Sequence, residues 1–130
     1  MRPAIVTTAT GKFGQTVRIG PHALVADEPT EDGGDDRGPA PHELLLAGLG
    51  ACTSMTVKMY ADRKGWPLEG VEVTVEGQQR EGAFVFQRRL EFDGPLSEEQ
   101  RARLVEIAEK CPVHKTLTGA IHIETTLLPR

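Results

Sequence analysis

Residues 41–64 read PHELLLAGLGACTSMTVKMYADRK, and this stretch decides the fold. It opens with Pro41, which suits the first turn of a helix because its missing N–H would have no partner there. Glu43 in the same turn complements the helix dipole, and Gly65 follows Lys64 as a stop signal. The pattern therefore predicts one helix of about 24 residues, about 36 Å long.

Leucine, alanine and methionine side chains cover most of the circumference of this predicted helix. A helix that is apolar nearly all round is a buried one. A chain of 130 residues has too little further mass to surround so long a helix on every side. We therefore predict a partner surface, most simply a second copy of the chain in a homodimer.

The sequence on either side of the helix predicts an α+β fold in a single domain over residues 1–130. Three short strands form an antiparallel meander within residues 1–26, and an acidic, Gly- and Pro-rich loop follows at 27–40. After the helix, residues 70–128 read as a ββαβ segment. The order βββ-α-ββ-α-β excludes a parallel, doubly wound sheet.

Alternating apolar residues and turn signals place the individual elements. The second helix begins with a capping box at Ser97, carries Cys111 on its apolar stripe and ends at Pro112. Strands are predicted at residues 5–8, 15–19, 23–26, 71–79, 83–92 and 120–127.

Composition excludes several classes of function. The formal net charge of −4 argues against a nucleic-acid partner, which requires a basic face. The longest uninterrupted apolar run, Leu44 to Cys52, is far shorter than the roughly 20 residues of a membrane span, so no membrane partner is expected. The N-terminal residues lack the apolar segment of a secretory signal, and we expect a cytoplasmic protein with reduced thiols.

Two cysteines, Cys52 and Cys111, are the candidate reactive groups. Only the thiolate is reactive, and burial disfavours it, so Cys52 is either an inert core residue or lies beside a cation. A disulfide between the two requires Cα atoms within about 7 Å, which the sequence leaves open. The cations that a fold could bring to Cys52 are Lys12, Arg18, Arg37, His114 and Lys115.

A metal site is not expected, and neither is a cofactor. Cys111 and His114 form one short-spaced ligand pair, whereas zinc sites usually carry two. His42 and Cys52 are about 15 Å apart along the predicted helix and cannot share an ion.

Two motifs carry a resemblance that covers nearly the whole chain. The stretch GPAPHELLLAGLGACTSM (38–55) and the stretch CPVHKTL (111–117) resemble the two cysteine motifs of the osmotically inducible protein C / organic hydroperoxide resistance (OsmC/Ohr) family. The resemblance implies an intertwined homodimer with two long central helices and antiparallel sheets outside them.

The same resemblance implies a chemistry for the two cysteines. The residue matched by Cys52 attacks an organic hydroperoxide and becomes a sulfenic acid, and the residue matched by Cys111 then forms a disulfide with it. A lipoyl-protein or thioredoxin-like dithiol restores both thiols. The implied function is reduction of organic hydroperoxides to alcohols in oxidative stress defence.

The chain departs from the family at the residues that assist the first thiol. The family's glutamate, ten positions before that cysteine, is His42 here, with Glu43 next to it. The family's arginine in the first hairpin turn is missing from Gly11–Gly14. Arg18, Arg37 and Lys12 are the predicted substitutes for that arginine, with Glu43 or His42 to orient an arginine. The alternatives are a non-catalytic dimeric binding module for a small apolar or thiol-containing ligand, or a redox sensor.

Overall fold

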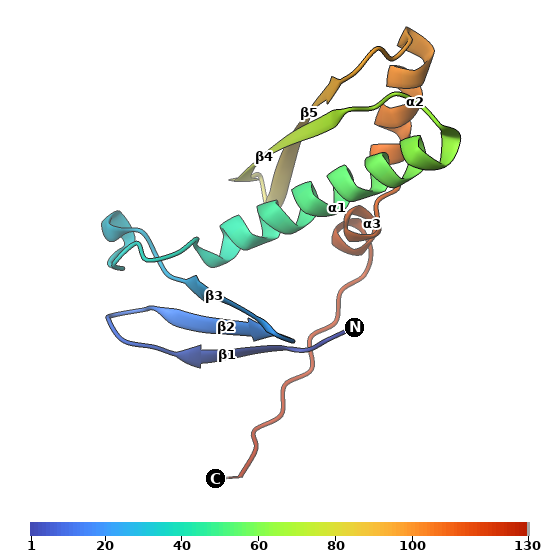
Figure 1. The fold of residues 1–130 in the computed structure, drawn as a ribbon. Helices are drawn as coiled ribbons and strands as arrows, with labels where there is room; N and C mark the ends of the chain where they lie inside the picture. Colours follow the sequence, from blue (N-terminus) through green and yellow to red (C-terminus); the bar gives the residue numbers. More distant parts are fainter. Residues whose placement is uncertain (130) are drawn as a thin grey trace. The chain divides into compact units, whose positions relative to one another are not determined.

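A computed structural model describes residues 1–129, which form two compact units. The first unit is Met1–Ala47 and the second starts at Gly48. The long helix α1 (Pro41–Lys64) has the bounds that the sequence predicts and belongs to both units (Figure 1). The predicted α+β class with antiparallel sheets is confirmed.

The first unit contains a three-stranded antiparallel meander, as predicted. Its strands are β1 (Ala4–Thr8), β2 (Gln15–Ile19) and β3 (His22–Ala26), in that order across the sheet. Val17 in the central strand is buried, whereas most apolar side chains of the two outer strands are exposed. The sheet therefore has little core of its own within this unit.

The loop at 27–40 is ordered by one buried carboxylate. Asp27 is only 2% exposed and accepts hydrogen bonds from the backbone amides of Glu28 (2.7 Å) and Arg37 (3.2 Å). Burial raises the pKa of Asp27, but these amides, the Asp35 amide and the charge of Arg37 together outweigh it, and the net pKa lies below the usual value. The loop also contains a short 3-10 helix, η1 (Thr30–Asp32), that the sequence analysis did not predict.

The second unit is built on a β-hairpin and one face of α1. Strands β4 (Gly70–Arg80) and β5 (Ala83–Asp93) pair over their whole length. Their two-residue turn has positive φ at both Glu81 (46°) and Gly82 (79°), as the right-handed twist of a tight hairpin requires.

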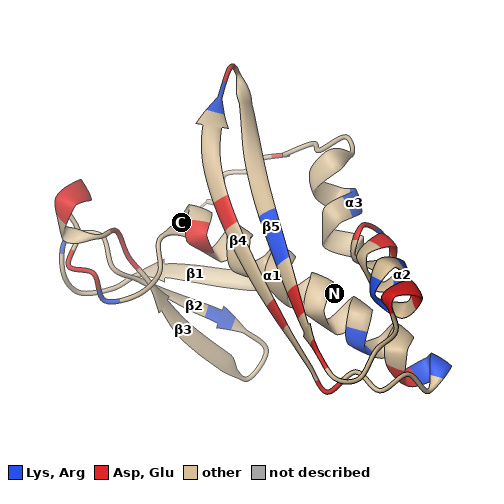
Figure 2. Ribbon diagram, turned by 90° about the horizontal axis from the view of Figure 1, so that it is seen from above, with Lys and Arg blue, Asp and Glu red and all other residues tan. Residues whose placement is uncertain are grey.

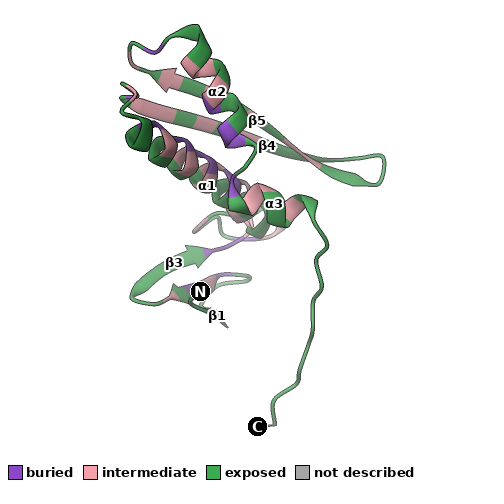
Figure 3. Ribbon diagram, turned by 90° about the vertical axis from the view of Figure 1, so that its right-hand side faces the viewer, coloured by how far each residue is buried: buried purple, intermediate pink, exposed green. Residues whose placement is uncertain are grey.

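Helix α2 (Glu98–Ala108) begins with the predicted capping box, in which Ser97 and Gln100 satisfy each other's amides. Its residues Leu104 and Ala108 pack with Val57 and Ala61 of α1 to form the core of this unit. The buried positions of α1 are spaced by four residues and lie along one side of the helix (Figure 3).

Two predictions for the C-terminal segment are wrong. Helix α2 ends at Ala108, and Pro112 begins a further helix, α3 (Pro112–Thr118), because proline at the first position needs no N–H partner. The predicted strand at 120–127 is not formed, and residues 120–129 are extended and exposed without regular structure. A strand exists only when another strand pairs with its backbone, and none within residues 1–129 does so here.

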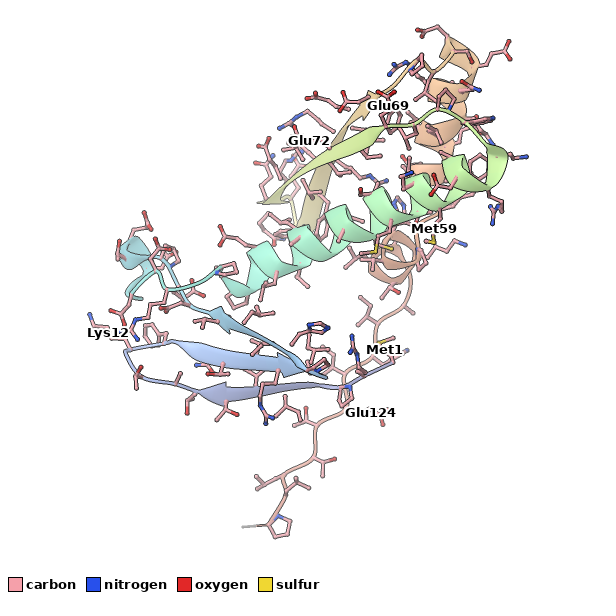
Figure 4. All side chains as sticks on the ribbon, in the orientation of Figure 1. Met1, Lys12, Met59, Glu69, Glu72 and Glu124 are labelled. Carbon is pink, nitrogen blue, oxygen red and sulfur yellow. The ribbon has the colours of Figure 1, made fainter. Side chains whose placement is uncertain are left out.

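The side of α1 away from the core is apolar but exposed. Met55 is 62% exposed and Met59 63%, and the Met59 side chain points away from the β4–β5 hairpin (Figure 4). By length and composition alone, α1 is also apolar enough to cross a membrane. A core helix of a soluble protein satisfies the same criterion of length and composition.

Candidate functional site

The two cysteines meet at the beginning of α3. Cys52 is half-buried on α1, and Cys111 is the residue that caps the N-terminus of α3. The backbone amide of Val113 donates to Cys52 Sγ at 3.5 Å, and that of His114 donates to Cys111 Sγ at 3.3 Å. Both thiols are free, and their sulfurs accept hydrogen bonds from two consecutive backbone amides.

The Cys111 thiol is fully buried yet ionises more readily than an ordinary cysteine. Burial raises its pKa, as expected for an anion without water. Hydrogen bonds with the His114 amide, the Thr53 hydroxyl and the Cys52 thiol, together with the positive charge of Arg88, outweigh that effect. The net pKa of Cys111 therefore lies below its usual value.

Arg88 is the nearby cation that the sequence analysis missed. It lies midway along β5, in the basic segment seen in Figure 2, and its side chain is only 11% exposed. Its guanidinium donates to Thr53 Oγ1 (3.0 Å) and Glu109 Oε2 (3.1 Å) and contacts His114 Nδ1 (3.0 Å). Because a guanidinium only donates, Nδ1 of His114 accepts, and its proton is on Nε2.

A sequence signal for Arg88 did exist. In a strand, alternate residues share one face of the sheet. The residues of β5 on this face are Phe84, Phe86, Arg88, Leu90 and Phe92. Arg88 is thus a charged residue in an otherwise apolar row, and a charge in that position is buried with partners or serves a function.

A cavity of about 460 Å³ lies next to this arginine. Its apolar wall includes Phe84 and Phe86, whose rings are 4.9 Å apart in an edge-to-face arrangement. Its polar lining includes Arg88, Glu109 and His114. The cavity therefore combines an apolar wall with hydrogen-bonding groups, as small-molecule sites usually do.

The predicted helper residues all lie in the first unit, whereas both cysteines lie in the second. Arg18 is exposed on β2, and Arg37 Nη1 donates to Thr10 Oγ1 at 3.1 Å. Glu43 Oε1 accepts a hydrogen bond from the Ala40 amide at 2.7 Å, which caps the start of α1.

The remaining predicted candidates are exposed. His42 is exposed in the first turn of α1, and Lys12 is exposed in the β1–β2 turn, where its amide donates to Asp35. Lys115 is exposed on α3. Among residues 1–129, no three His, Cys, Asp or Glu side chains are grouped to hold a metal ion.

A comparison with models of protein families shows which family this chain belongs to. A profile of the OsmC-like protein family matches residues 33–126, which include both cysteines. The chain belongs to the OsmC-like family. The predicted family resemblance is confirmed. No curated protein matches the sequence.

Solved structures of other OsmC-like proteins share the fold. An OsmC-like protein from Mycoplasma pneumoniae is 22% identical, with a TM-score of 0.77 over 92% of this chain and 88% of that one. An organic hydroperoxide resistance protein OsmC from Legionella pneumophila is 26% identical, with a TM-score of 0.65 over 90% of both chains. A putative organic hydroperoxide resistance protein from Vibrio cholerae is also 26% identical, with a TM-score of 0.65 over 90% of this chain and 85% of that one. That structure holds captopril in one of its active sites.

Proposed function

We propose that this OsmC-like protein reduces organic hydroperoxides to alcohols with Cys52 as the attacking cysteine and Cys111 as the resolving one. The observation that carries the proposal is the meeting of two free thiols from α1 and α3. Cys52 is half-buried and Cys111 is fully buried, so Cys52 is the one that a peroxide reaches first.

The first step oxidises Cys52. Its thiolate attacks the terminal peroxide oxygen, the O–O bond breaks, and the departing alkoxide takes a proton to become an alcohol. The sulfur is left as a sulfenic acid.

The second step uses Cys111. Its thiolate attacks the Cys52 sulfur, the S–S bond forms, and the S–O bond breaks to release hydroxide, which is protonated to water. A dithiol, lipoyl- or thioredoxin-like, then reduces the disulfide by exchange and is itself oxidised to a disulfide. The cavity with its phenylalanine wall favours an organic peroxide over hydrogen peroxide.

The test is peroxide consumption by the purified protein with excess dithiol. Cumene hydroperoxide, tert-butyl hydroperoxide and hydrogen peroxide are compared, with Cys52→Ser and Cys111→Ser alongside. We expect fast loss of the organic peroxides that Cys52→Ser abolishes. Rates no better than those of Cys52→Ser would refute the peroxidase.

A binding module for a small apolar or thiol-containing ligand is the second candidate function. The cavity of about 460 Å³ favours it, as does the thiol drug captopril in the active site of the Vibrio cholerae relative. Calorimetric titration with captopril and with its S-methyl ether tests this candidate. Binding of captopril without any peroxide turnover would favour the module over the enzyme.

We further propose a homodimer in which the exposed side of α1 is covered by the second copy. The exposed methionines Met55 and Met59 support this, because apolar patches on a helix are usually covered. The extended residues at 120–129 supply backbone groups that a partner can pair. A monomer by sedimentation at micromolar concentration would refute the dimer.

A further inference from the structure

Arg88 is held toward the thiol pair by contacts that its sequence neighbour lacks. Its guanidinium is largely removed from water and bonds Thr53, Glu109 and His114. Arg89 is on the opposite face of β5, is 61% exposed and pairs with Glu76. The two adjacent arginines therefore form a matched pair for experiment, one buried at the site and one in solvent.

The Thr53 hydroxyl connects Arg88 to Cys111. Thr53 is fully buried, and its hydroxyl donates to the Leu49 carbonyl at 2.7 Å. A hydroxyl has one proton and two lone pairs. One lone pair accepts from Arg88 Nη1 at 3.0 Å, and the oxygen lies 3.7 Å from Cys111 Sγ.

This geometry supports two states of Cys111. When Cys111 is a thiol, its S–H donates to the Thr53 oxygen, while the Thr53 hydroxyl continues to donate to the Leu49 carbonyl. When Cys111 is ionised, the Thr53 proton turns to the sulfur. Arg88 still donates to Thr53 in the second state, and its charge then faces an anion across one hydroxyl.

We propose that Arg88 is a positioning residue for Cys111, acting through the Thr53 hydroxyl to hold the sulfur in place and to stabilise its thiolate for attack on oxidised Cys52. The inference rests on the proposed peroxidase for its use in turnover, but the link from Arg88 to Cys111 is a property of the resting protein. The contacts assign Arg88 to the resolving step. The Thr53 oxygen, which Arg88 contacts, lies next to Cys111, whereas the donor to Cys52 is the Val113 amide.

The resolving step explains why such a residue is needed. Cys111 must be a thiolate to attack the Cys52 sulfenic acid, and a fully buried thiol resists ionisation. In that attack the S–S bond forms as the S–O bond breaks, and the departing hydroxide becomes water by taking up a proton from solvent, which replaces the proton that Cys111 lost on ionising. A cation one hydroxyl away offsets the cost of the buried anion.

The first experiment needs no peroxide. In a Cys52→Ser background, the pH dependence of Cys111 alkylation by iodoacetamide reports its thiolate. Arg88→Met should shift the curve to higher pH and lower the rate near pH 7 by about tenfold, the effect expected of one hydrogen bond to a charged group. Thr53→Val should act in the same direction, Thr53→Ser should restore the wild-type curve, and Arg89→Met should leave it unchanged.

A double variant tests whether Arg88 and Thr53 act on Cys111 through the same chain of contacts. If Arg88 acts through Thr53, Arg88→Met with Thr53→Val should be no worse than the more affected single variant. Fully additive losses would overturn the proposal, and so would an unchanged curve in Arg88→Met. If Arg88→Met fails to fold, the alkylation curves of Thr53→Val, Thr53→Ser and Arg88→Lys test the proposal in its place.

The second experiment measures turnover with Cys52 intact. After one equivalent of cumene hydroperoxide, Arg88→Met should form the disulfide more slowly once Cys52 is oxidised, so that dimedone traps more sulfenic acid per oxidised Cys52 than in the wild type. Slower oxidation of Cys52 with normal resolution would assign Arg88 to Cys52 and overturn the proposal. Absence of any peroxide reaction in the wild type would refute the peroxidase, while the alkylation curves would still decide the role of Arg88.

Discussion

The backbone amide of Val113 donates a hydrogen bond to the Cys52 sulfur over 3.5 Å, although 61 positions separate the two residues in the chain. The next amide, that of His114, donates to Cys111. Successive amides of the first turn of α3 therefore hold the two sulfurs beside each other. Two thiols held by adjacent amides of one turn need little movement to form a disulfide.

The first prediction follows from this arrangement. Mild oxidation with diamide should convert the protein to an intramolecular Cys52–Cys111 disulfide at a rate independent of protein concentration. Free thiols are counted after denaturation, and non-reducing electrophoresis detects any crosslinked chains. Cys111→Ser serves as the control and should not form the internal bond. A rate proportional to protein concentration would contradict the prediction, because it would mean that the disulfide joins different chains.

A second prediction concerns the core of the second unit. Leu104 is fully buried between α2 and α1, so Leu104→Ala should lower the free energy of unfolding by about 2–5 kcal/mol through lost burial and the remaining cavity. Val105 is the next residue and is 47% exposed, so Val105→Ala should cost no more than about 0.5 kcal/mol. Urea unfolding measures both, and equal losses would show that α2 does not pack as described.

A third prediction concerns the pH dependence of stability. The folded pKa of Asp27 is lowered, so the ionised carboxylate stabilises the fold above its unfolded pKa of about 4. This contribution is lost as the pH falls through the folded pKa. Asp27→Asn should therefore be less stable than the wild type at about pH 7, and the difference should shrink below about pH 4.

Urea unfolding across this pH range measures the difference. Asp32→Asn is a matched control, because Asp32 is exposed in η1 and a stability difference is not expected there. If the free energy of unfolding of Asp27→Asn differs from that of the wild type by the same amount at every pH, the carboxylate charge does not contribute to the difference.

The fourth prediction concerns the exposed side of α1. Met59→Glu places a charge within the apolar surface that we propose to be covered by a second copy, and it should convert the dimer to a monomer. Sedimentation velocity measures the change. Lys58→Ala is the neighbouring control, because the Lys58–Asp62 pair is exposed and should contribute at most about 1 kcal/mol. A Met59→Glu protein that remains a dimer would exclude this face as the interface.

Local signals in the sequence were sufficient to predict several elements. Pro41 and Gly65 bracket α1, and the Ser97–Gln100 box begins α2. Each signal acts between residues a few positions apart, through backbone geometry or a cap, and so it can be read without the fold. The cysteine pair was also found from the sequence, through two motifs that resemble a family.

Contacts over long separations were outside the reach of the sequence. The link from Arg88 to Thr53 spans 35 positions, and periodicity could mark Arg88 as unusual without naming its partner. The predicted strand at 120–127 failed for a related reason, because its alternating pattern is local while a strand needs a paired backbone elsewhere. The sequence by itself thus determined the long helix, the hairpin and the reactive residue types. Only the tertiary structure decided which cation and which amides face each sulfur, because those contacts depend on how distant segments pack.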